Sequence, residues 1–220
     1  MKSKFFLQLI ICLAFLCAPV AAVLAAPVAP AAAEAWADKT GRELLDTFRD
    51  PDIGRRFANL DRLFLENIDL DYVARFVMGK YWKTMSEGQK NVYLPLFRRY
   101  ALSSYKTFPL DFVDSLSYKV TGASADRQFT TVTAVVHVQM NPEQPAEDFV
   151  LYFRLHETGG KIKLVDIKLA ESSLILAYRN KFYQQIAELD DEISWFLEDL
   201  ETQTLSNENN NRHKLEMFLN

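Results

Sequence analysis

The chain has 220 residues, of which 49% are hydrophobic and 25% charged, and its formal net charge is −4. This composition is typical of a globular protein with a sizeable core. A mildly acidic chain is a poor match to nucleic acid and to anionic membrane surfaces, so neither is expected as a partner.

The N-terminal segment has the layout of a secretory signal peptide. Lys2 and Lys4 precede an apolar run over residues 5–16, and small residues follow it. This order of positive, apolar and small residues marks a chain for export. Cleavage is plausible near residues 20–22 or near residues 31–33, and an uncleaved membrane anchor is the alternative. We therefore expect residues 1–33 to be signal peptide and spacer.

Both cysteines of the chain, Cys12 and Cys17, lie inside this segment. The residues before them, Ile11 and Leu16, are larger than the small residue that a lipoprotein signal requires. The mature protein is therefore expected to carry no lipid anchor and no cysteine. It then has no disulfide, no thiol chemistry and no cysteine-ligated metal.

Helical periodicity follows in the first half of the mature chain. Residues 36–48 predict a first helix, which ends before Pro51. Asp52 is suited to cap a second helix, in which apolar residues recur at spacings of three and four through Ile68.

Two further helices are expected before residue 109. Asp69 or Asp71 begins a short helix that Gly79 ends. Ser86–Gln89 has the spacing of a capping box and starts a long helix. Pro95 lies in the early part of that helix and weakens the prediction of an unbroken one.

The periodicity then changes from helical to alternating. Four segments alternate apolar and polar side chains, which predicts four strands with one apolar face each. They span residues 116–120, 131–140, 149–156 and 165–169. Short connections between them, among them Thr158-Gly159-Gly160, favour antiparallel hairpins.

The chain ends in a helical region and a polar tail. Helical periodicity covers residues 173–200 and is divided at Asp190-Asp191, and residues 206–220 are polar and predict a disordered tail. The fold class is therefore α+β: a four-stranded antiparallel meander covered on one face by N- and C-terminal helices, within one domain over residues 34–205.

Catalytic and metal-binding patterns are sparse. His137 and His156 lie on the polar faces of neighbouring strands, and without a third ligand they are interpreted as solvated surface residues rather than a metal site. No phosphate-binding loop or nucleophile motif is present. Asp166 and Glu171 leave a carboxylate pair open, although nothing in their spacing selects catalysis. We expect no enzyme activity, no metal and no cofactor.

Three segments carry a resemblance to a known family. They are Met78–Lys83 with the helix start at Ser86–Gln89, then Phe97–Tyr105, and then Val165–Ile167 followed by Ser172–Phe182. In this order they resemble the MlaC family, also called the toluene-tolerance auxiliary family, of periplasmic phospholipid-binding proteins. The resemblance covers roughly residues 36–200.

The resemblance implies a periplasmic carrier that encloses the acyl chains of a phospholipid. A related branch, HpnM, is associated with hopanoids, so a hopanoid-like cargo is also implied. The implied partners are an inner-membrane ABC transporter with an MCE-domain subunit and an outer-membrane lipoprotein–porin complex.

The residues expected to contact lipid come from the long helix and the inward strand faces. They are Phe97, Tyr105, Val136, Val138, Phe149, Leu151, Phe153, Val165 and Ile167. Arg179 either fixes its helix against the sheet or lies near a phosphate at the pocket mouth. Plain core packing is the competing interpretation of each apolar residue, and the chain is then a protein-binding adaptor with a solid core.

Overall fold

The structure is a computed structural model that describes residues 27–106, 115–139, 143 and 145–219. Residues 1–26, the larger part of the expected signal peptide and spacer over residues 1–33, lie outside these ranges. Within them, no helix is long and apolar enough to cross a membrane.

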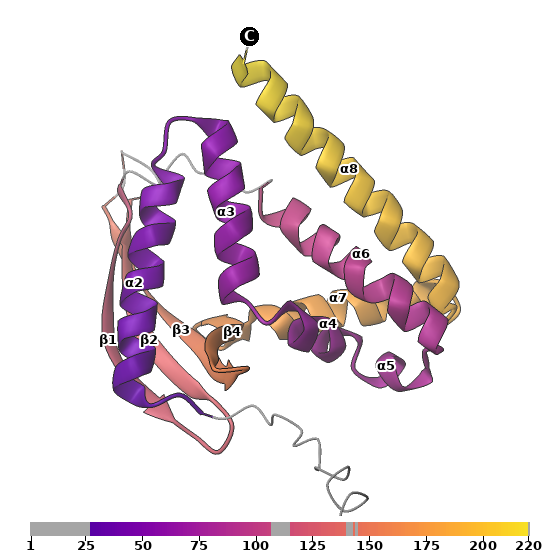
Figure 1. The fold of residues 1–220 in the computed structure, drawn as a ribbon, viewed down its shortest axis with the longest axis horizontal. Coiled ribbons are helices and arrows are strands. Elements are labelled where there is room, and N and C mark those ends of the chain that lie inside the picture. Colours follow the sequence, from indigo (N-terminus) through magenta and orange to yellow (C-terminus); the bar gives the residue numbers. More distant parts are fainter. Residues whose placement is uncertain (1–26, 107–114, 140–142, 144, 220) are drawn as a thin grey trace, which may run out of the picture.

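Five helices precede the sheet in the described chain, and two follow it (Figure 1). The first five are α2 (Pro30–Phe48), α3 (Ile53–Asn67), α4 (Leu70–Met78), α5 (Lys80–Thr84) and α6 (Glu87–Tyr105). The two that follow are α7 (Leu174–Glu188) and α8 (Ile193–Leu219). Pro95 does not interrupt α6, which corrects the doubt about an unbroken helix.

The sheet is an antiparallel meander in the order β1-β2-β3-β4-β5. Its strands are β1 (Ser117–Ala125), β2 (Thr130–Val138), β3 (Glu147–Thr158), β4 (Lys161–Leu169) and β5 (Ser172–Ser173). The meander is as expected, but the sheet has five strands rather than four. The two residues of β5 were too few to leave an alternating pattern. Gly159 and Gly160 both have positive φ, as the tight hairpin between β3 and β4 requires.

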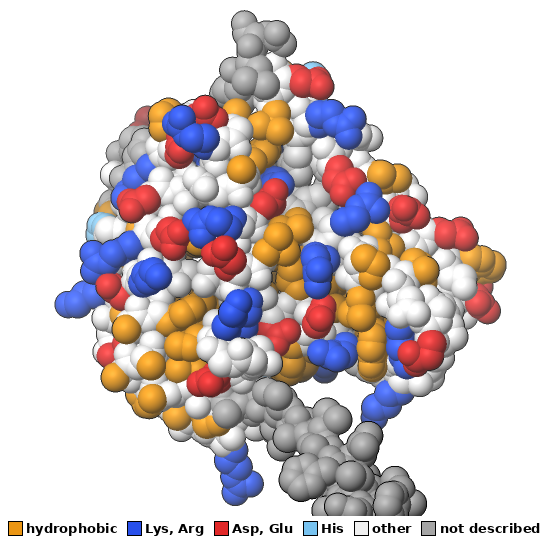
Figure 2. Space-filling view, in the orientation of Figure 1, with side chains coloured by type: hydrophobic (Ala, Val, Ile, Leu, Met, Phe, Trp, Pro, Cys, Tyr) orange, Lys and Arg blue, Asp and Glu red, His pale blue; other side chains and the backbone are white. Residues whose placement is uncertain are grey.

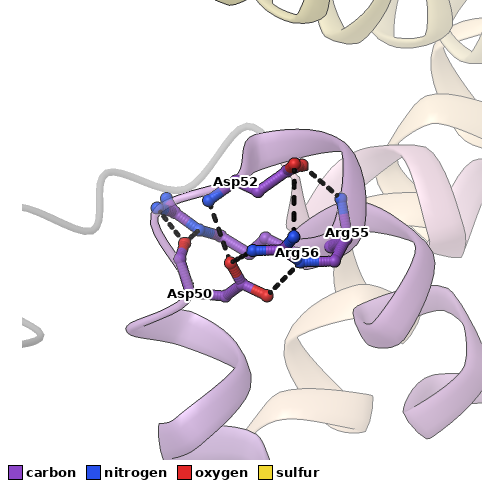
Figure 3. Close-up of polar contacts among 4 residues, drawn as sticks. All are labelled: Asp50, Asp52, Arg55 and Arg56. Atoms are coloured by element: carbon purple, nitrogen blue, oxygen red, sulfur yellow. Dashed lines mark hydrogen bonds and ion pairs between the residues drawn. The ribbon is translucent and has the colours of Figure 1, made fainter.

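The predicted helix starts are confirmed. Asp52 and Asp69 each accept a hydrogen bond from a backbone N–H in the first turn of their helix, and Ser86 forms the complete capping box. A second carboxylate holds the corner before α3: Asp50 accepts from the backbone N–H of Asp52 and from the Arg55 guanidinium (Figure 3). This network links the residue after α2 to the first turn of α3.

The first helix begins earlier than expected. Residues 27–33 were assigned to a spacer, but α2 starts at Pro30, and Val28 and Ala33 are buried. The Thr130 hydroxyl of β2 donates to the carbonyl oxygen of Val28 at 2.5 Å. Small residues in this stretch resembled a processing region, and their burial against the sheet left no signal in the sequence.

The disordered tail was also a wrong expectation. Residues 206–219 continue α8 as one helix, which packs along α6. Asn211 is buried, and its Nδ2 donates to the carbonyl oxygen of Ser103 at 2.9 Å. The polar composition of the tail therefore combines a solvated outer face with hydrogen bonds from Asn207 and Asn211 to α6.

The core is divided into two clusters. One is α2 packed on the sheet, with Val28, Ala33, Ala37, Val132 and Leu155 at its centre. The other is formed by the helices α4 to α8 and includes the fully buried Phe182 and Phe196. Figure 1 shows α2 across β1 and β2, with the other helices gathered beyond β4. The helices flank the sheet as expected, but they do not form one layer over one face.

Candidate functional site

An apolar pocket of about 160 Å³ lies where α3, α4, α6 and α7 meet β4. Its lining is formed by Phe64, Ile68, Leu70, Val73, Phe97, Tyr100, Ala101, Tyr105, Leu164, Val165, Asp166, Ile167, Leu174, Ile175 and Tyr178. Asp166 is the one ionisable carboxyl in that lining. A lining of this kind favours apolar groups over polar ones.

The pocket exists because β4 is almost an edge strand. Its neighbour β5 has only two residues, so most of the β4 edge faces the helices. The corner between α3 and α4 is drawn to that edge: the backbone N–H of Asp69 donates to the carbonyl oxygen of Leu164 at 3.0 Å, and Ile68 forms a bridge to Leu164. Apolar side chains on both sides of this junction then line the pocket.

Asp166 anchors the start of α7. Its carboxylate accepts from the Ser173 hydroxyl at 2.7 Å and from the backbone N–H of Ile175 at 3.2 Å. Glu171, the other candidate for a carboxylate pair, is exposed on the turn before β5. Both oxygens of Asp166 are thus engaged in holding a helix N-terminus, and the hydrolase interpretation gains no support from the geometry.

The α3–α6 side of the pocket is fastened by a polar cluster. The hydroxyl of Tyr105 donates to Asp61 at 2.5 Å, and the Lys106 ammonium lies 2.7 Å from the other oxygen of that carboxylate. Burial, together with the hydrogen bond to Asp61, raises the pKa of Tyr105. The Tyr105 ring stacks on Phe64 with centroids 4.9 Å apart. Figure 2 shows hydrophobic side chains at the surface between α3 and α6.

The two strand histidines have different surroundings. His137 is exposed, as expected, and it pairs with Asp148. His156 is only 2% exposed, which corrects the expectation that both are solvated. Its Nε2 lies 2.9 Å from Asp69, and its ring packs against the rings of Tyr72 and Phe129. No group of three metal-ligating side chains occurs among the described residues.

The Asp69 carboxylate joins the start of α4 to His156 of β3. Burial opposes its ionisation, but hydrogen bonds from His156 and from the Tyr72 backbone outweigh burial and lower the pKa of the Asp69 carboxyl. One side chain thereby caps α4 and ties the α3–α4 corner to β3. This corner supplies Ile68 and Leu70 to the pocket.

Four of the ten residues expected to contact lipid line the pocket: Phe97, Tyr105, Val165 and Ile167. The five residues expected from β2 and β3 lie outside its lining: Val136, Val138, Phe149, Leu151 and Phe153. Phe153 packs instead into the cluster beneath α2, and Val136 pairs with Phe149 in the same sheet. The apolar faces of β2 and β3 were expected to be covered by helices with a lipid pocket between. The helix that packs on this part of the sheet is α2.

Arg179 also lies outside the pocket lining. Its guanidinium donates twice to the carbonyl oxygen of Phe76, at 2.9 and 2.6 Å, and lies 3.7 Å from the centroid of the Phe76 ring. Of the two roles expected for Arg179, the structure places it in the helix-fixing one, although it fixes α7 to α4 rather than to the sheet.

Several lining residues were not among the expected contacts, chiefly Phe64, Tyr100 and Tyr178. Tyr100 and Tyr178 lie within segments whose family resemblance was recognised. Phe64 is on the apolar stripe of α3, which periodicity identified as a helix. The missing information was the meeting of α3 with α6 and α7, and no local pattern encodes that contact.

The chain is similar to a known protein family and to a solved structure. The family model described as MlaC protein matches residues 38–202. A phospholipid-binding protein from Ralstonia solanacearum, solved in complex with a phospholipid, is similar in structure with a TM-score of 0.63 and 18% identity. The match covers 80% of this chain and 98% of that chain. At this identity the likeness concerns the fold alone. No curated protein matches the sequence significantly.

Proposed function

The chain belongs to the MlaC protein family, and from that membership we propose that it is a lipid carrier that encloses the acyl chains of a phospholipid. The observation that carries this proposal is the apolar pocket between β4 and the helices α3, α4, α6 and α7. No reacting group is needed for this task, so the protein is proposed to be a carrier and not an enzyme.

The physical need for such a carrier is large. A phospholipid has roughly thirty acyl methylenes, and exposure of each to water costs about 0.8 kcal/mol. Unaided transfer through water would therefore cost on the order of 24 kcal/mol. A pocket with an apolar lining removes most of this cost while the headgroup remains in water.

The pocket must widen to hold acyl chains. Its volume of about 160 Å³ is below the roughly 300 Å³ of the smallest common ligand pockets. On the α3–α6 side the walls are held by the bonds from Tyr105 and Lys106 to Asp61 and by the stacking of Tyr105 on Phe64. Separation of α3 from α6 would enlarge the pocket without opening the cluster beneath α2.

The proposed setting is the periplasm, between two membranes. We propose that the chain receives and delivers phospholipid, or a hopanoid-like lipid, through an inner-membrane ABC transporter with an MCE-domain subunit and an outer-membrane lipoprotein–porin complex. Family membership supports this assignment, and the apolar pocket fits the cargo.

The fold also favours one of the two cleavage points. Cleavage near residues 31–33 would remove Pro30 from the start of α2 and Val28 from the core cluster. Cleavage at or before Ala26 would leave both in place. N-terminal sequencing of the exported protein should therefore find a first residue no later than Val28, and a start after residue 33 would contradict this.

The pocket size keeps a second candidate function in consideration. A pocket below the usual ligand volume is what a protein-binding adaptor with a nearly solid core would show. The two functions differ in whether the purified protein holds lipid at all.

Organic extraction of the purified protein, followed by mass spectrometry, tests the carrier proposal. We expect about one lipid per chain, and uptake of labelled phospholipid from liposomes after delipidation. Absence of extracted lipid together with absence of uptake would favour the adaptor.

A further inference from the structure

A second cavity adjoins the apolar pocket. It is an open groove of about 800 Å³ between α6, α7 and α8. Tyr100, Leu174 and Tyr178 line both the groove and the pocket, so they form a shared wall between the two. Leu174 is 49% exposed, and Tyr100 packs edge-on against Tyr178.

The groove differs chemically from the pocket. Its remaining lining residues are Ser104, Ala177, Lys181, Thr202, Gln203, Ser206 and Asn207. Six of these seven side chains carry a polar group, one of them is cationic, and none is acidic, whereas the shared wall is apolar and aromatic. An apolar pocket that adjoins a polar, cationic groove matches the two ends of a lipid whose headgroup is anionic.

Lys181 is the cation of the groove, and it has no anionic partner in the part of the chain that the structure describes. Its ammonium donates to the Tyr100 hydroxyl at 2.8 Å and to Oε1 of Gln203 at 3.4 Å, both neutral oxygens. None of the ion pairs among the described residues includes it. A phosphate oxygen would give this ammonium an anionic acceptor, and hence an ion pair in addition to the hydrogen bond.

The α8 side of the groove lies mostly beyond the family match. That match ends at residue 202, whereas Gln203, Ser206 and Asn207 follow it. Asn207 is held against α6 by a hydrogen bond to Ser104 at 3.3 Å. The groove therefore depends on the continued helix that replaces the expected disordered tail.

We propose that this groove binds the phosphate of a phospholipid headgroup, with Lys181 as its cationic partner, while the acyl chains enter the adjoining pocket. The proposal rests on the proposed function, because the groove is a headgroup site only if tails bind next to it. The shared wall of Leu174 and Tyr178 is where the glycerol would cross.

The test compares two lipids that differ only in the phosphate. Delipidated full-length mature protein is titrated with dioleoyl phosphatidic acid and with dioleoylglycerol, each competing with a fluorescent fatty acid. Lys181→Gln should lower the affinity for phosphatidic acid about tenfold or more, because a hydrogen bond to a charged group is lost. The affinity of the same variant for dioleoylglycerol should equal that of the wild type.

Two control variants separate the groove from general charge effects. Lys181→Arg keeps the charge and should retain most of the preference for phosphatidic acid. Lys119→Gln removes the same charge from an exposed position on β1 and should leave both affinities unchanged. Equal loss in Lys119→Gln would show a non-specific charge effect and overturn the proposal.

Other outcomes distinguish this proposal from the carrier function. An unchanged preference for phosphatidic acid in Lys181→Gln, with wild-type binding intact, overturns the groove assignment and leaves the carrier function standing. Binding of neither lipid by the wild type contradicts both. If inorganic phosphate binds in a Lys181-dependent manner while the affinity for phosphatidic acid does not depend on Lys181, the groove holds free phosphate, and the headgroup assignment is wrong.

Discussion

The α2–sheet region and the helical region bury apolar side chains in different ways. Beneath α2, Val132 and Leu155 are fully buried in a cluster that brings the helix onto the sheet. Around β4, side chains from four helices converge on a strand edge and leave a pocket. Apolar residues on a strand therefore indicate burial in both regions, but the apolar pocket lies where helices meet the edge of a strand.

The largest expected effect on stability comes from truncation in the α2–sheet region. Leu155→Ala removes a side chain with no exposed surface and should lower the free energy of unfolding by about 2–5 kcal/mol. Lipid affinity, measured on the folded protein, should not change. Urea unfolding measures the free energy of unfolding. The control is Leu176→Ala, at a 45% exposed position, which should change the free energy of unfolding by less than about 0.5 kcal/mol.

Added volume in the same region should also destabilise. A Cβ at Gly41 would overlap the ring of Tyr118 where α2 meets β1. Gly41→Ala should therefore lose about 1–3 kcal/mol by overpacking, which outweighs a gain of up to about 1 kcal/mol in helix propensity. Gly88→Ala is the matched control, because its Cβ would lie 3.8 Å from the nearest atom. A stability gain in both variants would contradict close packing at Gly41.

Added volume in the helical region should affect phospholipid uptake rather than stability. Ala101→Leu places three more carbons in the pocket, where space exists, so stability should change by less than about 1 kcal/mol. Phospholipid uptake from liposomes should fall sharply because the added side chain occupies the space for the acyl chain. Normal uptake together with a large loss of stability would show that this region is as solid as the sheet region.

The smallest effect concerns alkaline pH. Burial raises the pKa of Tyr118 to about 12, and its hydroxyl donates to the carbonyl oxygen of Ala37. Because the folded pKa is raised above the unfolded value of 10, its contribution to stability is present below pH 10 and is lost as the pH rises towards about 12. Tyr118→Phe should lose less stability than the wild type between pH 9 and pH 11 in urea unfolding. An identical loss would contradict this assignment.

Local patterns predicted most of the elements but not their meeting places. Asp52, Asp69 and Ser86 act on neighbours within three residues, so their capping roles were readable from the sequence. The pocket depends on contacts such as that of the Asp69 backbone with Leu164, 95 residues apart in the chain. Five of the expected contact residues, from Val136 to Phe153, were placed by assuming one helical layer over the sheet.

The two errors at the chain ends have a common origin. Small residues near Ala33 and polar residues near Asn211 both lack the apolar stripe by which helices are recognised. Each helix segment is nevertheless held by distant partners, the sheet in one case and α6 in the other. Composition indicates whether a segment would form a helix on its own, whereas these two segments are held as helices by tertiary contacts.

Photo-crosslinking with a phospholipid that carries a reactive group in its acyl chain locates the bound tails. Binding in the pocket between β4 and the helices should place the label on Phe97–Tyr105 of α6 and on Val165–Ile167 of β4. Label concentrated on Val136, Phe149 or Leu151 would place the tails beneath the sheet and contradict binding in that pocket.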